Sequence, residues 1–189
     1  MDKYMTLSSH VTKVCQSASF AIAKIGSIRK YIDRSTAERL VHALVTSRLD
    51  SNNGLLYGLP GTVISKLQRV QNSAVRLVLG VKGYRVDIND LRRSELHWLP
   101  IRDRIAFKIL MLTYKSLHGL APPYLADLLT TYQPTRSLRS ATQFLLDPPR
   151  RIVTSYYGER AFSTSAPKLW NGLPQSIRKA TSLAIFKNT

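Results

Sequence analysis

The spacing of apolar side chains predicts a mainly α-helical protein. Apolar residues recur at intervals of three and four over about 8–28, 35–49 and 62–80, the period of helices with one buried face. The same period returns over about 101–118, directly after Pro100, whose fixed φ suits the first turn of a helix. We therefore expect helical, bundle-like subdomains to form most of the fold.

Several residues are candidates for helix ends. Ser35 and Glu38 have the spacing of a capping box at the start of the second helix. Gly80 is a suitable stop for the third helix, because glycine readily adopts the left-handed conformation that ends helices. Asn89 or Asp90 could cap a short helix that follows.

The pattern weakens in the last third of the chain. One or two helical turns are expected over 124–129, and short strands are possible at 143–146 and 151–156, so minor β structure is predicted there. The stretch RAFSTSAPKLWNGLP, residues 160–174, has two prolines and a glycine around Trp170, which predicts an irregular segment. We interpret it as a structural clasp against the core rather than as a binding site.

The turn-forming residues divide the chain into two regions. The stretch VKGYRVD, residues 81–87, is the predicted linker between a first helical region, 1–80, and a second region, 88–189. The second region is expected to be helical with an irregular or minor β segment.

Charge narrows the expected partners. The 189 residues include 28 Lys and Arg against 11 Asp and Glu, a formal net charge of +17 and a pI near 10.4. This excess favours nucleic acid first and an anionic membrane surface second. The sequence shows neither an apolar stretch long enough to span a bilayer nor a secretory signal, and Cys15 is the single cysteine. A nuclear or cytoplasmic protein is therefore expected.

The basic residues form recognisable groups. Within 62–80, Lys66, Arg69 and Arg76 lie opposite the apolar side and predict a basic stripe along a rigid helix. In two other places a pair of arginines precedes aromatic residues, a combination that can pair with phosphates and stack on bases. The candidate nucleic-acid-binding residues are Lys66, Arg69, Arg76, Arg92, Arg93, Arg104, Lys108, Lys115, Arg150 and Arg151.

The aromatic residues have a second interpretation. Trp98 follows the first arginine pair, and Tyr156 and Tyr157 follow the second. Large aromatic side chains are more often core anchors than stacking surfaces. For Trp98, and likewise for Phe107, Tyr114 and Trp170, the core interpretation is therefore preferred.

Catalytic and metal chemistry find little support. The four histidines and Cys15 have no spacing typical of a zinc site, and the acidic residues are scattered rather than paired for Mg²⁺. The sequence also has no phosphate-binding loop and no nucleophile elbow. We expect no catalytic residues, no metal and no cofactor.

Four long motifs carry a resemblance that covers nearly the whole chain. They are LVHALVTSRLDSNNGLLYGLP, ISKLQRVQNSAVRLVLG, LHWLPIRDRIAFKILMLTYKSLHGLAPPYLADLL and YGERAFSTSAPKLWNGLPQSIR. In this order and with similar gaps, they resemble the region after the polymerase palm in reverse transcriptases of jockey-like non-LTR (LINE-type) retrotransposons.

This resemblance implies a non-catalytic piece of a larger RNA-directed DNA polymerase. The palm aspartates of the family, in a Phe/Tyr-Ala-Asp-Asp motif, have no counterpart here, so the chain alone is not expected to copy RNA. The helices over 8–80 would correspond to a thumb that holds the template–primer duplex. The part after Gly80 would bind RNA or DNA.

Other functions stay open at this stage. The same charge and helices would suit a host DNA- or RNA-binding protein, such as a helix-turn-helix regulator. A relic reading frame without a function is a further alternative. An enzyme would require polymerase or nuclease activity in the isolated chain.

Overall fold

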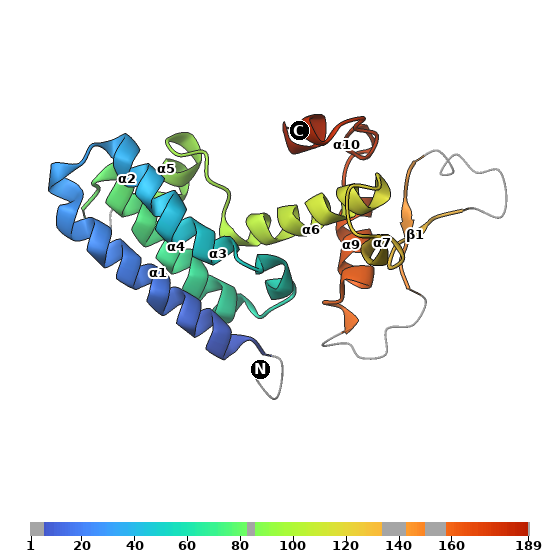
Figure 1. The fold of residues 1–189 in the computed structure, drawn as a ribbon, viewed down its shortest axis with the longest axis horizontal. Helices are drawn as coiled ribbons and strands as arrows, with labels where there is room; N and C mark the ends of the chain where they lie inside the picture. Colours follow the sequence, from blue (N-terminus) through green and yellow to red (C-terminus); the bar gives the residue numbers. More distant parts are fainter. Residues whose placement is uncertain (1–5, 83–85, 134–142, 150–157, 189) are drawn as a thin grey trace. The chain divides into compact units, whose positions relative to one another are not determined.

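The described part of the protein is mainly α-helical, with a single small sheet (Figure 1). A computed structural model describes residues 6–82, 86–133, 143–149 and 158–188. This architecture confirms the predicted fold class.

The chain divides into two compact units, Met1–Ile105 and Ala106–Thr189. The division falls inside α6 (Ile101–Leu117), later than the predicted linker at 81–87, of which residues 83–85 lie outside the described part. The reason is burial: Ile88, Leu96 and Trp98 lie in the same hydrophobic core as the preceding helices. The segment after the predicted linker therefore belongs to the first unit.

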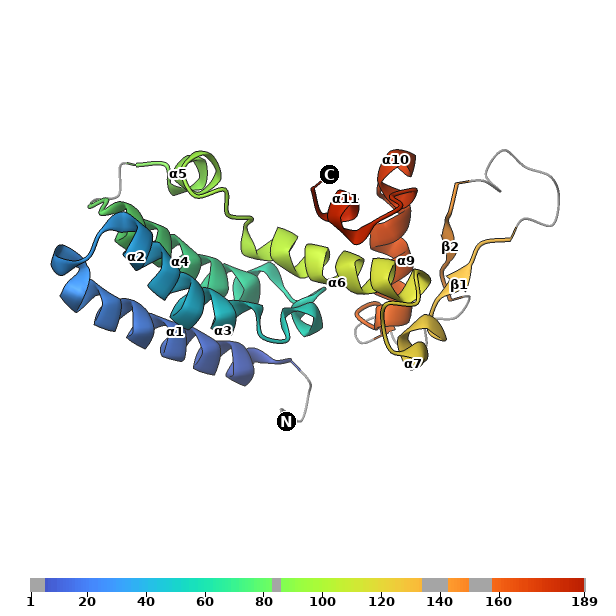
Figure 2. The same cartoon turned by 45° about the horizontal axis from the view of Figure 1, so that its top comes forward.

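In the first unit, α1 (Ser8–Ile28), the stretch from α2 (Arg34–Val41) to α3 (Ser47–Asp50), and α4 (Gly61–Leu79) lie side by side in both views (Figures 1 and 2). Their apolar faces meet in one core, in which Val11, Val41 and Val75 are fully buried. This confirms the three helices predicted from periodicity. The elements are α1 (Ser8–Ile28), η1 (Arg29–Tyr31), α2 (Arg34–Val41), η2 (His42–Thr46), α3 (Ser47–Asp50), η3 (Asn53–Leu56), α4 (Gly61–Leu79) and α5 (Ile88–Ser94).

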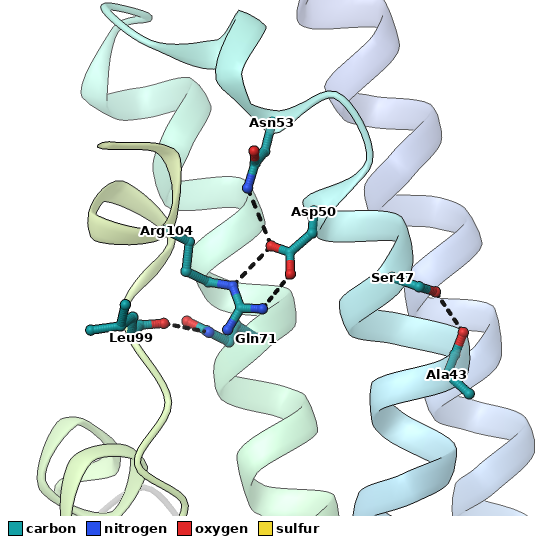
Figure 3. Close-up of polar contacts among 7 residues, drawn as sticks. All are labelled: Ala43, Ser47, Asp50, Asn53, Gln71, Leu99 and Arg104. Carbon is teal, nitrogen blue, oxygen red and sulfur yellow. Dashed lines mark hydrogen bonds and ion pairs between the residues drawn. The ribbon is translucent and has the colours of Figure 1, made fainter. Parts of the chain in front are cut away.

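The helical stretch from α2 to α3 is continuous through a π-helical turn, η2. A π turn lengthens the hydrogen-bond spacing, so carbonyl groups beside it need other donors. Ser47 Oγ donates to the Ala43 carbonyl at 2.5 Å, and the Arg48 guanidinium donates to the Leu44 carbonyl (Figure 3 shows the Ser47–Ala43 contact). Both carbonyls therefore accept a side-chain donor at the π turn.

The helix ends partly differ from the predictions. Asp33, not Ser35, caps α2, with its Oδ1 accepting from the Thr36 backbone N–H at 3.0 Å. The helix starts at Arg34, so Ser35 is already inside its first turn. Likewise Asp87 caps α5. Gly80 ends α4 with φ of 66°, as predicted.

Two glutamines of α4 bind the chain where it enters α6. Gln71 Nε2 donates to the Leu99 carbonyl at 2.9 Å (Figure 3), and Gln68 Oε1 accepts from the Ile101 backbone N–H at 3.0 Å. The Gln68 amide also donates to Gln71 Oε1 at 2.8 Å. This pair satisfies backbone groups that a helix start would otherwise leave without partners.

The second unit has short elements around a smaller core. A two-stranded antiparallel sheet pairs Thr130 with Asp147 and Thr131 with Leu146. The elements after α6 are α7 (Pro123–Ala126), β1 (Thr130–Thr131), β2 (Leu146–Asp147), α9 (Phe162–Asn171), α10 (Gln175–Arg178) and α11 (Leu183–Asn188).

The β predictions were only partly right. The strand predicted at 143–146 overlaps β2 at Leu146, and β1 was not predicted. The strand predicted at 151–156 lies outside the described residues. Two-residue strands depend on their pairing partner, which apolar periodicity does not reveal.

The prediction of an irregular segment at 160–174 was wrong over its central part, because residues Phe162–Asn171 form α9 with Pro167 inside the helix. Proline removes the hydrogen bond to the Ser163 carbonyl. The helix persists because Pro167 and Trp170 are fully buried, so tertiary packing overrides the local preference.

The predicted clasp role for this stretch agrees with its contacts. Trp170 Nε1 donates to the Phe144 carbonyl at 2.8 Å, and its ring stacks on Phe186 at 5.8 Å. The Asn171 side chain acts as a strand partner for Leu146, since it accepts from its N–H at 2.9 Å and donates to its carbonyl at 2.8 Å. Helix α9 thus holds β2 by a ring and an amide.

Asn171→Ala should destabilise the protein by about 1–3 kcal/mol, because both Leu146 backbone groups lose their partner. Urea unfolding followed by circular dichroism measures the change. Ser176→Ala, an exposed position on α10, is the matched control and should stay within about 0.5 kcal/mol of wild type. Equal midpoints for the two variants would contradict a clasp role for Asn171.

Candidate nucleic-acid interface

The predicted basic stripe exists on α4. Lys66 and Arg69 are exposed, and Arg76 is half-buried one to two turns further along the helix. Ser73 lies between them and is exposed. The opposite side of α4 contributes Leu67, Val75 and other buried residues to the core. The helix therefore carries exposed Lys66 and Arg69 away from the core that Leu67 and Val75 enter.

Helix α1 runs along the stripe. Gly26 of α1 lies against α4, since a Cβ built on it would be 3.8 Å from Leu77 Cδ1. The charges of Lys66 and Arg69 on α4 act to lower the pKa of Cys15 on α1, so these side chains are also near one another. Gly26 follows Cys15 by eleven residues on α1, and Leu77 follows Lys66 by eleven residues on α4, so the two helices run parallel. Neither helix contains an Asp or Glu. The side of this helix pair that carries Lys66, Arg69 and Cys15 is positively charged, and we call it the α1–α4 face.

Small side chains border the stripe on the α1 side. Thr12 and Ser19 are exposed and share the flank of Cys15 and Gly26 by helical spacing. The sequence reasoning did not identify this flank. The available signal was the absence of acidic residues over 8–28, which becomes informative only once α1 is placed beside α4.

Arg29 is a further residue that the sequence reasoning did not identify. Its guanidinium donates to the Leu77 and Val78 carbonyls, each at 2.9 Å, and to the Ile32 carbonyl at 2.9 Å. A cation at a helix C-terminus satisfies open carbonyls and complements the helix dipole. Arg29 thus joins the end of α4 to the turn after α1.

Arg92 has a structural position that its candidate role did not anticipate. It is buried, and its guanidinium donates to Asn89 Oδ1 at 3.0 Å and to Asn72 Oδ1 at 3.4 Å. Burial, and then the charge of Arg93, lower the pKa of Arg92 below its usual value. These contacts join α5 to α4, whereas the neighbouring Arg93 is exposed.

Arg104 is also engaged inside the first unit. Its Nε donates to Asp50 Oδ1 at 2.9 Å, and a second guanidinium nitrogen donates to Asp50 Oδ2 (Figure 3). Asn53 Nδ2 donates to the same carboxylate at 3.3 Å. A bidentate pair of this kind neutralises the guanidinium, so the prediction that Arg104 contacts phosphates does not agree with its position.

The remaining candidates lie in other parts of the chain. Lys108 is exposed and Lys115 is half-buried, both on the part of α6 in the second unit. Arg150 and Arg151, together with Tyr156 and Tyr157, lie outside the described residues.

The core interpretation of the aromatic residues holds for three of the four. Trp98, Tyr114 and Trp170 are buried, and the Tyr114 hydroxyl donates to the Ala180 carbonyl at 3.0 Å. Phe107 differs, with 38% of its surface exposed. Trp98 is therefore not a stacking partner for Arg92 and Arg93.

Comparison with protein-family models, curated proteins and solved structures finds no match for this chain. In the described part of the chain, no three His, Cys, Asp or Glu side chains come together as a group that could hold a metal ion. Within residues 6–82, 86–133, 143–149 and 158–188, none of the helices combines the length and apolar character that a bilayer span requires.

The Cys15 thiol can report on the α1–α4 face. Burial raises its pKa above the usual value, and the nearby charges of Lys66 and Arg69 partly offset this rise. Removing those charges in Lys66→Gln/Arg69→Gln should therefore raise the pKa of Cys15 further, because positive charge stabilises the thiolate. The pH dependence of iodoacetamide alkylation measures this pKa, and the chain has a single cysteine to react.

Lys13→Gln/Lys24→Gln is the control for this measurement. Helical spacing places both lysines on the side of α1 opposite Cys15. The control should leave the alkylation profile close to that of wild type. If the two double variants shift the profile equally, α4 does not present Lys66 and Arg69 to Cys15.

Proposed function

We propose that this chain binds nucleic acid through the α1–α4 face, as the non-catalytic C-terminal part of a non-LTR retrotransposon reverse transcriptase. The observation that carries the binding proposal is the pairing of two long, parallel helices without an acidic residue, one of which carries exposed Lys66 and Arg69. The link to reverse transcriptases rests on the sequence motifs described above.

The dimensions of the stripe suit a phosphate backbone. From Lys66 to Arg76 the helix rises about 15 Å at 1.5 Å per residue. Successive phosphates of one strand advance by about 3.4 Å along a duplex axis, so the stripe extends along roughly four of them. Lysine and arginine on a rigid helix would bind these phosphates without reading the bases.

The α1 flank would let a strand approach closely. Thr12, Cys15 and Ser19 have short side chains, which leaves room for a strand beside Lys66 and Arg69. The Thr12 hydroxyl donates to the Ser8 carbonyl at 2.9 Å, which leaves the Ser19 hydroxyl to contact a phosphate oxygen. Binding of this kind is dominated by counterion release, so it should be strong at low salt and weakly selective for sequence.

Reversing the stripe in Lys66→Glu/Arg69→Glu should weaken binding by about tenfold or more and reduce the slope of log affinity against log salt by about two. Fluorescence anisotropy with an RNA–DNA hybrid, duplex DNA and single-stranded RNA over a salt series measures both quantities. Circular dichroism checks that the helices are retained.

Lys13→Glu/Lys24→Glu makes the same change in charge on the opposite side of α1. A local interface predicts a small effect for this control, whereas binding by net charge alone predicts the same loss for both variants. Salt-resistant binding to one duplex sequence would instead support a sequence-specific regulator. Weak binding of wild type to all three probes at moderate salt would reject the proposed function.

A further inference from the structure

The second unit contains a hollow of about 780 Å³ beside the small sheet. Its walls include His118, Tyr132, Phe144, Trp170 and Lys179. The acidic residues of this unit are Asp127, Asp147 and Glu159, and none of them is among the residues that line the hollow. A volume of this size lies in the range typical of small-ligand sites.

Phe144 is an exposed aromatic residue with an unusual backbone. Its side chain is 60% exposed, and its φ of 53° lies in the left-handed region that residues other than glycine rarely adopt. Such a conformation persists only where the surroundings impose it, and these residues are common at functional sites. An exposed phenyl ring at a position of this kind is not explained by core packing.

The surroundings of Phe144 impose this conformation through two buried side chains. The Phe144 carbonyl accepts from Trp170 Nε1 at 2.8 Å, and the carbonyl of the preceding residue, Gln143, accepts from Arg178 Nε at 2.9 Å. Arg178 is buried and also donates to the Asn171 and Leu173 carbonyls at 3.0 and 2.6 Å. The ring is therefore presented to solvent by a fixed backbone.

The charge beside the ring is positive. The Lys179 ammonium lies 6.0 Å from the centroid of the Phe144 ring, and Lys179 is exposed. The guanidinium of Arg178 binds neutral carbonyls, so its positive charge is not cancelled by them. His118, which also lines the hollow, is stacked on Tyr114 with 3.9 Å between ring centroids.

We propose that this hollow is a subsite for an unpaired base of single-stranded nucleic acid, which stacks on Phe144 while its phosphate lies near Lys179. This inference rests on the proposed function and adds a contact that would distinguish single strands from duplexes. The Lys179 ammonium lies over one face of the Phe144 ring, so a planar base would stack on the other face, with its phosphate near the ammonium. In a duplex the bases are stacked on one another, so this contact would be closed to it.

Two oligonucleotides of about eight nucleotides test the subsite: a single-stranded thymidine oligonucleotide and an abasic one of the same length and charge. Anisotropy titrations of the full chain should give a five- to 150-fold higher affinity for the oligonucleotide with bases, the range expected for one stacking contact. Phe144→Leu should bring this ratio close to one. Phe144→Tyr should keep the ratio, because it restores an aromatic ring.

Lys179→Ala separates the phosphate contact from stacking. It should weaken binding of both oligonucleotides by a similar factor and leave their ratio intact. The proposal is overturned if Phe144→Leu keeps the ratio of wild type, or if wild type binds both oligonucleotides equally.

The two proposals fail in different ways. Phe144→Leu should leave duplex binding unchanged, and Lys66→Glu/Arg69→Glu should leave the ratio between the two oligonucleotides unchanged. If Lys66→Glu/Arg69→Glu fails to weaken duplex binding, the α1–α4 face is rejected and the subsite is not. If Phe144→Leu fails to lower the affinity ratio of the two oligonucleotides, the subsite is rejected and the α1–α4 face is not.

Discussion

The first unit depends on the contact between two α4 glutamines and the backbone at the start of α6. Gln71 donates to the Leu99 carbonyl and Gln68 accepts from the Ile101 N–H, so side-chain amides serve groups that cannot pair inside a helix. Trp98, just before this contact, lies in the core, and Arg104, just after it, binds Asp50. Because buried backbone groups without partners are costly, the chain has a strong reason to continue past residue 87 as part of the same core. The glutamines also occupy the side of α4 that faces the protein, which leaves the stripe of Lys66 and Arg69 on the other side.

Apolar periodicity was sufficient to predict the long helices but not where the first unit ends. Helices α1, α4 and α6 follow directly from their sequences, since each repeats apolar residues at intervals of three and four over several turns. The stretch VKGYRVD contains turn formers, and turn formers alone do not distinguish a linker from a loop within one domain. What decides is whether the next segment finds a core to join, and Ile88 and Leu96 do. The short elements of the second unit were hardest to predict, because β1 and β2 exist through each other and through the Asn171 amide.

The candidate site was predictable as a stripe but not as a face. Helical spacing places Lys66 and Arg69 together, and the structure leaves both exposed. The same reasoning assigned Arg92 and Arg104 to nucleic acid, although Asn89 and Asp50 bind them inside the protein. The sequence does not indicate whether an arginine has a partner inside the protein, because that partner can be distant along the chain, as Asp50 is from Arg104. The α1 flank was missed for the complementary reason: small residues such as Thr12 and Ser19 gain meaning only from their neighbour.

The two units also differ in how their arginines are used, and this difference bears on what each unit can bind. In the first unit, Arg29, Arg92 and Arg104 are drawn inward to carbonyls, amides or a carboxylate, and the exposed positive charge left on α4 comes from Lys66 and Arg69. In the second unit, Arg178 donates to backbone carbonyls, including that of Gln143. This contact holds the neighbouring Phe144 in a left-handed conformation with its ring exposed. Holding an apolar ring in water brings no folding benefit, because transfer of that ring from solvent is the main source of its stabilising effect. The exposed ring beside Lys179 is therefore the feature on which the proposed base subsite rests. Under the two proposals, the α1–α4 face would bind the phosphates and the Phe144 ring would stack on a base of the same polymer.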